Sequence, residues 1–393
     1  MSNNSKTKPL PSFVEERLND FIQDLIAPNM NRKHLVLGQR PRPGSVVMQS
    51  NDYLALSNHP DIQQAHRDAI KNDGQSVVMS SIFLQDEDSK PEFEQQLAEL
   101  VGMESCLLSQ SGWAANIGLL QTICAENTPV YIDHYAHMSL WEGIRAANAV
   151  ARPFRHNNMT HLRKQLQRHG AGVIVVDSVY STIGTVAPLA DIYEMAQEFG
   201  CALIVDESHS LGTHGKQGAG LVHELGLTEQ VDLMTVSLAK AFAYRAGAIL
   251  GPKSMADSLP FVAFPAIFSS TVLPEEVSRL EKTLQVIKSA DERRERLFEC
   301  STLLKDGLSK IGFNIRSDSQ IIALECGDER NTERVRDFLE NNDVFGAVFC
   351  RPATAKNNNI IRFSVNSDLS MSDIDHVLTV CQQAFNHKDL QFA

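Results

Sequence analysis

The sequence predicts an α/β fold in which a mostly parallel sheet is followed by a smaller α+β region. From about Pro91 to Asn386, short apolar strand-like runs alternate with segments of helical periodicity, and such alternation produces parallel strands joined by right-handed crossovers. At 393 residues the chain exceeds the length at which one hydrophobic core keeps growing, so two lobes are expected. We divide the chain into an N-terminal arm at 1–50, a cofactor-binding large domain at 51–275 and a small C-terminal domain at 276–393.

Each element is predicted from the spacing of its apolar residues. Helices are expected at 13–26, 91–102, 113–124 and 190–200, and a helical pattern over 278–312 is too long for an unbent helix. A strand-to-turn element is expected at 46–60, and strands at 104–112, 129–133, 172–181, 201–207, 231–237 and 246–252. The last four strands are expected to be separated by helices and therefore parallel. The segments 313–327, 332–343, 344–350 and 359–366 form the small domain.

Composition excludes several classes of protein. A net charge of −12 and a pI near 5.5 provide no broad basic field for nucleic acid or an anionic membrane. The seven cysteines are spread singly without a CxxC pair, which indicates free thiols in a reducing compartment. The N-terminal segment has no signal-peptide core, and no segment approaches about 18 uninterrupted apolar residues. We therefore expect a cytoplasmic protein with no membrane span.

Three polar side chains follow predicted strands. Lys240 comes just after the run VDLMTVS, Asp206 ends ALIVD, and His209 lies three residues further on. The carboxyl ends of parallel strands converge on the ligand crevice of an open sheet. An amine, a carboxylate and an imidazole in that place suit pyridoxal 5'-phosphate (PLP), whose aldehyde reacts with a lysine and whose ring nitrogen pairs with a carboxylate.

The phosphate of such a cofactor needs backbone donors. Ser111 and Gly112 lie between a strand and the helix that begins near Trp113, where free amide groups attract anions. Ser237 is close enough to Lys240 in the chain to add a contact. His137 follows another strand end, and its imidazole is suited to lie flat against the cofactor ring.

A metal site is the alternative use of the same histidines. The two clusters are the segment DHYAH, from Asp133 to His137, and the set of Glu207, His209 and His214. Neither has the HExxH spacing that aligns two ligands and a base, and Lys240 would then have no role. The chain also lacks GxGxxG, GxxxxGK[ST] and GxSxG. We predict PLP and no metal.

Seven motifs occur in order along the chain: NDYLAL, SQSGWAAN, DHYAHMSL, DSVYSTIGTVAPL, VDESHSLGTHGKQGAG, SLAKAFAYRAGA and FSSTVLP. In these motifs the chain resembles the α-oxoamine synthases, fold-type-I PLP-dependent transferases that act as homodimers and condense an amino acid with an acyl-CoA. Three further segments, LLSQSGWAANIGLLQTIC, AHMSLWEGIRAANA and VFCRPATAKNNNIIRFSVN, resemble the branch that makes precursors of quorum-sensing signals.

The resemblance implies a reaction. A medium-chain acyl-CoA would condense with a small amino acid or S-adenosylmethionine, releasing CoA and CO2 and leaving an α-aminoketone. The alternatives are an aminotransferase or another fold-type-I enzyme that does not use acyl-CoA, and a protein that retains the fold without catalysis.

The resemblance also assigns roles to residues. Lys240, His137 and Asp206 would be catalytic: Lys240 as the imine lysine, Asp206 as the partner of the pyridine nitrogen and His137 as the ring-stacking residue. His209 would contact the phenolic oxygen. The remaining assignments are Ser111, Gly112, Trp113 and Ser237 around the phosphate, Ser270 from the other subunit of a dimer, Asp177 and Ser181 in the cofactor pocket, and Asn51 and Arg362 for the amino-acid substrate.

Overall fold

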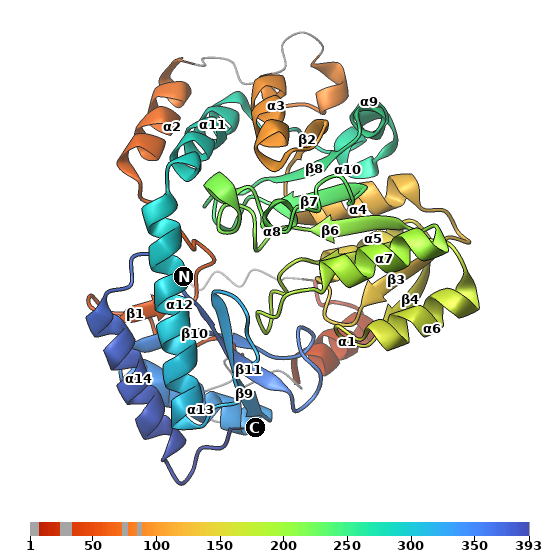
Figure 1. The fold of residues 1–393 in the computed structure, drawn as a ribbon. Helices are drawn as coiled ribbons and strands as arrows, with labels where there is room; N and C mark the ends of the chain where they lie inside the picture. The colour runs from red at the N-terminus through yellow and green to blue at the C-terminus, as the bar shows by residue number, and fades with distance from the viewer. Residues whose placement is uncertain (1–7, 24–33, 73–77, 85–88, 393) are drawn as a thin grey trace.

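The computed structural model describes residues 8–23, 34–72, 78–84 and 89–392. They form two sheets with helices packed around them (Figure 1). The larger sheet has seven strands in the order β2-β8-β7-β6-β5-β3-β4, and the smaller has four in the order β1-β10-β11-β9. The predicted α/β class, with a mostly parallel sheet and a smaller α+β region, is confirmed.

The larger sheet is parallel except at one strand. Its strands are β2 (Ser105–Ser109), β3 (Pro129–Asp133), β4 (Val150–Phe154), β5 (Val173–Asp177), β6 (Ala202–Asp206), β7 (Leu233–Ser237) and β8 (Gly247–Gly251). Strands β7, β6, β5, β3 and β4 run parallel, whereas β8 is antiparallel to both of its neighbours. The expectation that 246–252 follows a helical crossover is wrong, because the short connection 238–246 contains no helix and returns the chain antiparallel.

Helices cover both faces of this sheet. They are α3 (Lys90–Val101), α4 (Gly112–Ile123), α5 (Met138–Ala146), α6 (Met159–His169), α7 (Leu189–Phe199), α8 (Leu221–Glu224), α9 (Lys253–Val262) and α10 (Phe264–Ile267), with short 3₁₀ turns at Ser81–Phe83 and Lys216–Gly218. Along β5, Val173 and Val175 pack with α4, α5 and α9, whereas Ile174 and Val176 pack with α6 and α7. Because both faces of β5 are buried, its sequence is a continuous run of apolar residues rather than an alternation of apolar and polar residues.

The smaller sheet brings together distant parts of the chain. It contains β1 (Val46–Met48), β9 (Ile321–Gly327), β10 (Val344–Phe349) and β11 (Asn359–Ser364), and the helices of this region are α12 (Asp291–Ile311), α13 (Glu329–Asn341) and α14 (Met371–Phe385). Strand β1 pairs with β10 in parallel. The long helical pattern at 278–312 is broken as predicted, because α11 (Pro274–Lys288) ends two residues before α12 begins.

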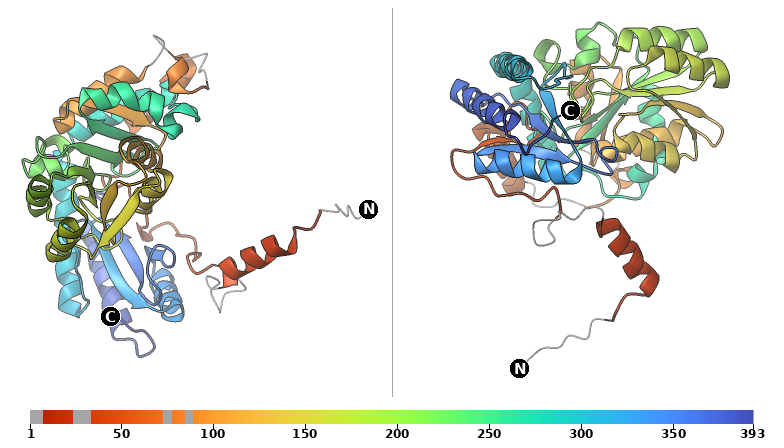
Figure 2. Two further views of the ribbon diagram at one scale, coloured as in Figure 1. Left: turned by 90° about the vertical axis from the view of Figure 1, so that its right-hand side faces the viewer. Right: turned by 90° about the horizontal axis from the view of Figure 1, so that it is seen from below.

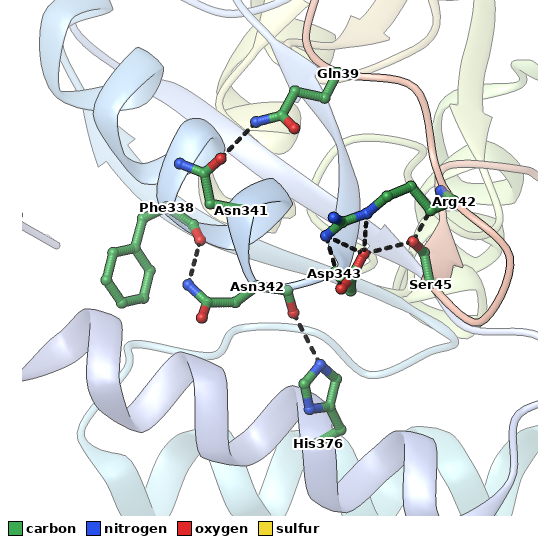
Figure 3. A network of polar contacts seen from close by, with 8 residues as sticks. All are labelled: Gln39, Arg42, Ser45, Phe338, Asn341, Asn342, Asp343 and His376. Atoms are coloured by element: carbon green, nitrogen blue, oxygen red, sulfur yellow. Dashed lines mark hydrogen bonds and ion pairs between the residues drawn. The ribbon is translucent and has the colours of Figure 1, made fainter.

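Polar contacts connect residues 39–45, which precede β1, to the end of α13 and the residue before β10 (Figure 3). Arg42 Nη2 lies 2.9 Å from both carboxylate oxygens of Asp343, which also accepts a hydrogen bond from Ser45 Oγ at 2.9 Å. The side-chain amide of Gln39 donates to Asn341 Oδ1 at 2.6 Å. These contacts fix the segment that leads through β1 toward residues 51–53. The division of the chain into three domains stays a prediction.

Helix α1 (Ser12–Gln23) extends away from the rest of the structure (Figure 2), whereas α2 (Pro60–Asn72) packs against α11. The last turn of the helix predicted at 13–26 lies outside the described residues. Within the described ranges, no helix is long and apolar enough to cross a membrane. The seven cysteines are free and buried, as predicted.

Candidate active site

A cavity of about 840 Å³ lies between the carboxyl ends of the parallel strands and the smaller sheet. Its walls come from the segments that follow β3, β5, β6 and β7, and from residues 349–362 around β11. Six of the predicted site residues line it: Asn51, His137, Ser181, His209, Lys240 and Arg362. Four of them follow parallel strands, whose carboxyl ends lie at one edge of the larger sheet. Arg362 on β11 and Asn51 after β1 reach the cavity from the smaller sheet.

Lys240 lies in the connection between β7 and β8, mostly shielded from solvent by the cavity walls. Burial lowers the pKa of Lys240, the Arg362 guanidinium lowers it further, and the Asp206 carboxylate opposes both effects. A lowered pKa increases the fraction of neutral amine, the form that reacts with an aldehyde or accepts a proton.

Asp206 is held at the end of β6 by three hydrogen-bond donors and is only 3% exposed. Its Oδ2 accepts from Asn116 Nδ2 at 2.7 Å, and its Oδ1 accepts from the backbone N–H of Ser208 at 2.9 Å and from the Ser208 hydroxyl. These donors fix one orientation of a buried negative charge. Asp206 also influences the pKa of both His137 and Lys240, so the three groups share one electrostatic environment.

The imidazole of His209 is buried and oriented by Tyr53. The Tyr53 hydroxyl lies 2.7 Å from His209 Nδ1 and 3.4 Å from Asn51 Oδ1, so we assign its proton to the shorter contact. Burial lowers the pKa of His209 well below its usual value, and the charges of Lys240 and Arg362 lower it further. In the neutral imidazole Nδ1 then accepts, and Nε2 carries the proton that can be donated to a ligand.

His137 caps the N-terminus of α5 and lines the cavity. Its Nδ1 lies 2.7 Å from Ser139 Oγ, and its backbone N–H donates to Asp177 Oδ2 at 3.0 Å. Burial lowers the pKa of His137, which favours the neutral ring. Asp177 is buried, and its carboxylate accepts the hydrogen bond from the backbone N–H of His137. Burial and the charge of Asp206 raise the pKa of Asp177 well above its usual value.

The N-terminus of α4 forms a close-packed cradle against β7. Ser111 is the N-cap residue, and its side-chain oxygen accepts a hydrogen bond from the backbone N–H of Ala114. The backbone N–H groups of Gly112 and Trp113, in the first turn of the helix, have no acceptor within the helix. A Cβ atom on Gly112 would lie 2.6 Å from the Cβ of Ser237, too close for any side chain. Free amides beside a serine at a helix N-terminus are suited to bind a phosphate.

Arg362 and Asn51 form a second polar group in the same cavity. Arg362 Nη2 donates to Asn51 Oδ1 at 2.7 Å, and Nη1 donates to the backbone carbonyl of Ser181 at 2.7 Å. The guanidinium carbon lies 4.5 Å from the centre of the Phe349 ring. Arg362 Nε is buried and has no partner among the described residues. A buried, oriented guanidinium with a free N–H is suited to bind a carboxylate.

Two predicted residues lie at the periphery. Trp113 is 46% exposed, and its ring meets His137 edge-on with 6.1 Å between ring centres. Ser270 is exposed, and its carbonyl accepts from the side chain of Gln110, next to the cradle. Its role from a second subunit stays a prediction.

The two proposed metal clusters do not assemble. Glu207 accepts a hydrogen bond from Ser210 Oγ at 2.9 Å, while His214 contacts the hydroxyl of Thr213 and the ring of Phe298. In the part of the chain that the structure describes, no group of three histidine, cysteine, aspartate or glutamate side chains is placed to hold a metal ion.

Sequence analysis missed the residues that orient the site, which are Tyr53, Asn116, Ser139 and Ser208. Tyr53 is fully buried against His209, from which it is separated by 156 residues in sequence. Asn116 reaches Asp206 across 90 residues. Only Ser208 carried a local signal, because it stands beside Asp206 in the segment DESH.

The side chains present fit PLP. The cradle at Gly112 offers amides to a phosphate, the oriented carboxylate of Asp206 offers an acceptor to a protonated ring nitrogen, and the shielded amine of Lys240 offers a nucleophile. All three lie at the carboxyl ends of strands of the larger sheet, which are β2, β6 and β7.

Comparison with known proteins agrees with this fit. The model of the family "Aminotransferase class I and II" matches residues 44–380. The chain is 74% identical over 393 residues, 100% of each chain, to a CAI-1 autoinducer synthase of Vibrio campbellii. It is 30% identical over 380 residues to an 8-amino-7-oxononanoate synthase of Symbiobacterium thermophilum, covering 94% of this chain and 96% of that one.

The fold has solved counterparts as well. A serine palmitoyltransferase from S. paucimobilis, with a bound PLP–myriocin aldimine, matches with a TM-score of 0.87 at 24% identity, covering 96% of this chain and 98% of that one. The chain therefore belongs to the aminotransferase class I and II family and, within it, to the α-oxoamine synthases, which makes it a PLP-dependent acyltransferase of fold type I.

Proposed function

We propose that this enzyme is an autoinducer synthase that condenses a medium-chain acyl-CoA with a small amino acid or S-adenosylmethionine. A bond forms between the α-carbon of the amino acid and the thioester carbonyl carbon, CoA leaves as the thiol, and the carboxylate leaves as CO2. The product is an α-aminoketone, a precursor of a quorum-sensing signal. The observation that carries the proposal is the 74% identity, over the whole of both chains, to the CAI-1 autoinducer synthase.

The residues of the cavity have complementary tasks in this reaction. Bound PLP would stabilise the electron pair left on the α-carbon when its proton departs. Arg362 binds the carboxylate of the amino acid and so fixes which bond at the α-carbon faces Lys240. Lys240 Nζ, whose pKa is lowered by burial, takes the α-proton. Asp206 would hold the pyridine nitrogen of the cofactor, and His209 would contact its phenolic oxygen.

We also propose that the enzyme works as a homodimer in the cytoplasm. Phe261, Phe264 and Phe268 on and beside α9 and α10 are 68%, 58% and 77% exposed. They lie in the same region as Ser270, close to the phosphate cradle. A patch of exposed aromatic side chains next to a ligand site is typical of a subunit interface.

The test is a CoA-release assay on the PLP-loaded protein. Thiol formation is followed with 2-aminobutyrate or S-adenosylmethionine and with acyl-CoAs of increasing chain length, and the product is identified by mass spectrometry. Lys240→Ala should abolish turnover, whereas Lys310→Ala, at an exposed position on α12, should not change it. Formation of a keto acid without release of CoA would instead support the aminotransferase alternative.

A further inference from the structure

The turn that carries Lys240 contains a strained backbone position. Ala243 has a φ of +50°, in the left-handed region that residues other than glycine rarely adopt. Its backbone N–H donates to the carbonyl of Lys240 at 2.8 Å, so the strained residue is bonded directly to the lysine. Strain of this kind persists only where the surrounding structure fixes the residues on both sides.

The side of the turn before Ala243 is fixed by the core. Leu238, Ala241 and Phe242 are each at most 1% exposed. The backbone N–H of Leu238 donates to the carbonyl of Ala246 at 2.9 Å, which closes the base of the turn. The conformation at Ala243 therefore depends on what fixes the residue that follows it.

The side after Ala243 is fixed by Tyr244, which contacts two helices. The Tyr244 hydroxyl donates to Glu276 Oε1 at 3.2 Å, and Glu276 Oε2 accepts from the backbone N–H of Leu273 at 2.9 Å, so the acceptor is itself held at the start of α11. Burial raises the pKa of Tyr244 to about 12, which keeps its hydroxyl protonated and able to donate. The Tyr244 ring also meets His66 of α2 edge-on, with 5.6 Å between ring centres.

A buried arginine adds to this anchor. The guanidinium carbon of Arg279, on α11, lies 4.8 Å from the centre of the Tyr244 ring. Arg279 is only 8% exposed, and its Nε has no hydrogen-bond partner among the described residues. A cation that is removed from water interacts more strongly with an aromatic ring than an exposed cation does. The Tyr244 ring therefore stabilises this buried charge, and the contact couples α11 to the turn.

We propose that Tyr244 is a positioning residue for Lys240. Held by Arg279 and Glu276, it keeps the turn in the strained conformation in which Lys240 lines the cavity. Without this anchor the turn relaxes at Ala243, and only a fraction of the molecules present the amine to a ligand. The proposal goes beyond the proposed function and rests on one part of it, the role of Lys240 as the imine lysine.

The test measures how fast the imine forms when PLP is added to the full-length apoprotein. The imine absorbance is followed by stopped flow, and borohydride reduction with peptide mass spectrometry identifies the lysine that is modified. Release of the strain at one left-handed alanine makes the competent turn about 5- to 30-fold less populated, so Tyr244→Ala should slow imine formation by that factor. Tyr244→Phe should retain most of the rate, because its ring still covers Arg279.

Ala243→Gly distinguishes positioning from a general loss of stability. Glycine populates positive and negative φ about equally, so this change alone should alter the rate by no more than about 2-fold. Combined with Tyr244→Ala, it should restore imine formation to within about 2-fold of the wild-type rate, because the turn then holds its conformation without strain. If Tyr244 contributes only to global stability, the added glycine will not rescue the rate.

Tyr193→Ala is the matched control. Tyr193, on α7, is partly buried against the same core as Tyr244, so its loss should lower the Tm without slowing imine formation. If Tyr244→Ala is too unstable to purify, Arg279→Met removes the cation and keeps the ring, and it should show a slower rate that Ala243→Gly again restores.

Two results would overturn the positioning role: a wild-type rate in the variants that lack the anchor, or a slow rate that Ala243→Gly does not restore. Failure of the underlying assignment has a separate signature. Borohydride labelling of a lysine other than Lys240 in the wild-type protein would overturn the role of Lys240 itself, whatever the variants show.

Discussion

Replacing Gly112 by alanine should weaken PLP binding, because the added methyl group has no room in the phosphate cradle. Its Cβ would lie 2.6 Å from the Cβ and 2.9 Å from the Cα of Ser237. Overpacking of this kind costs about 1–3 kcal/mol, and the N-terminus of α4 must move away from β7. A helix N-terminus contributes up to about 2 kcal/mol to a partly buried anion. Losing about 1–2 kcal/mol of that contribution raises the Kd of PLP about 5- to 30-fold.

The matched control is Gly118→Ala in the same helix. There the nearest atoms to the new Cβ would be the Cβ of Ala263 at 3.3 Å and the side chain of Pro265 at 3.8 Å, and none of them belongs to Ser237. Alanine in a helix interior is favoured over glycine by about 0.5–1 kcal/mol, which offsets the tight contact with Ala263. This variant should therefore be about as stable as the wild type and should bind PLP equally well. The assay is a titration of apoprotein with PLP, followed by tryptophan fluorescence. If Gly112→Ala bound PLP as tightly as Gly118→Ala, the cradle would not be the phosphate site.

Two further changes test the groups around Asp206. Asn116→Leu removes the 2.7 Å hydrogen bond to Asp206 Oδ2. A hydrogen bond to a charged group is worth about 1.5–3 kcal/mol, so the PLP affinity, measured by the same titration, should fall about 10- to 160-fold. An unchanged affinity would contradict the role of Asn116. Glu207→Gln tests a pH effect, because burial raises the pKa of Glu207 from 4.5 to about 7. The raised pKa favours the protonated carboxyl in the folded state, so its stabilising contribution is complete below the unfolded pKa and is lost as the pH rises through about 7. Denaturant unfolding of the wild type should show a loss of about 3 kcal/mol over this interval that is missing in the glutamine variant; parallel pH profiles for the two proteins would refute the assignment.

Local sequence spacing was sufficient to predict the elements that carry the chemistry. The apolar runs before Asp206 and Lys240 predicted buried strands, and the small residues at Gly112 predicted a helix start close to a strand. Because the carboxyl ends of parallel strands must meet at one edge of the sheet, His209, Asp206 and Lys240 could be placed together without knowing the packing.

Other features depend on pairings that no local pattern specifies. The direction of β8 follows from the short turn after Lys240, whereas β1 joins the smaller sheet only because Val46–Met48 pairs with β10, about 300 residues away in sequence.

The sequence by itself determined the fold class, the expectation of PLP chemistry and the strand-end residues of the candidate site, because periodicity and the order of elements along the chain can be read from local sequence. Tertiary structure alone decided how those residues are oriented. The contacts of Tyr53 with His209 and of Asn116 with Asp206 both depend on long-range packing. Orientation requires contacts between segments far apart in sequence, and these form only when the whole core has assembled.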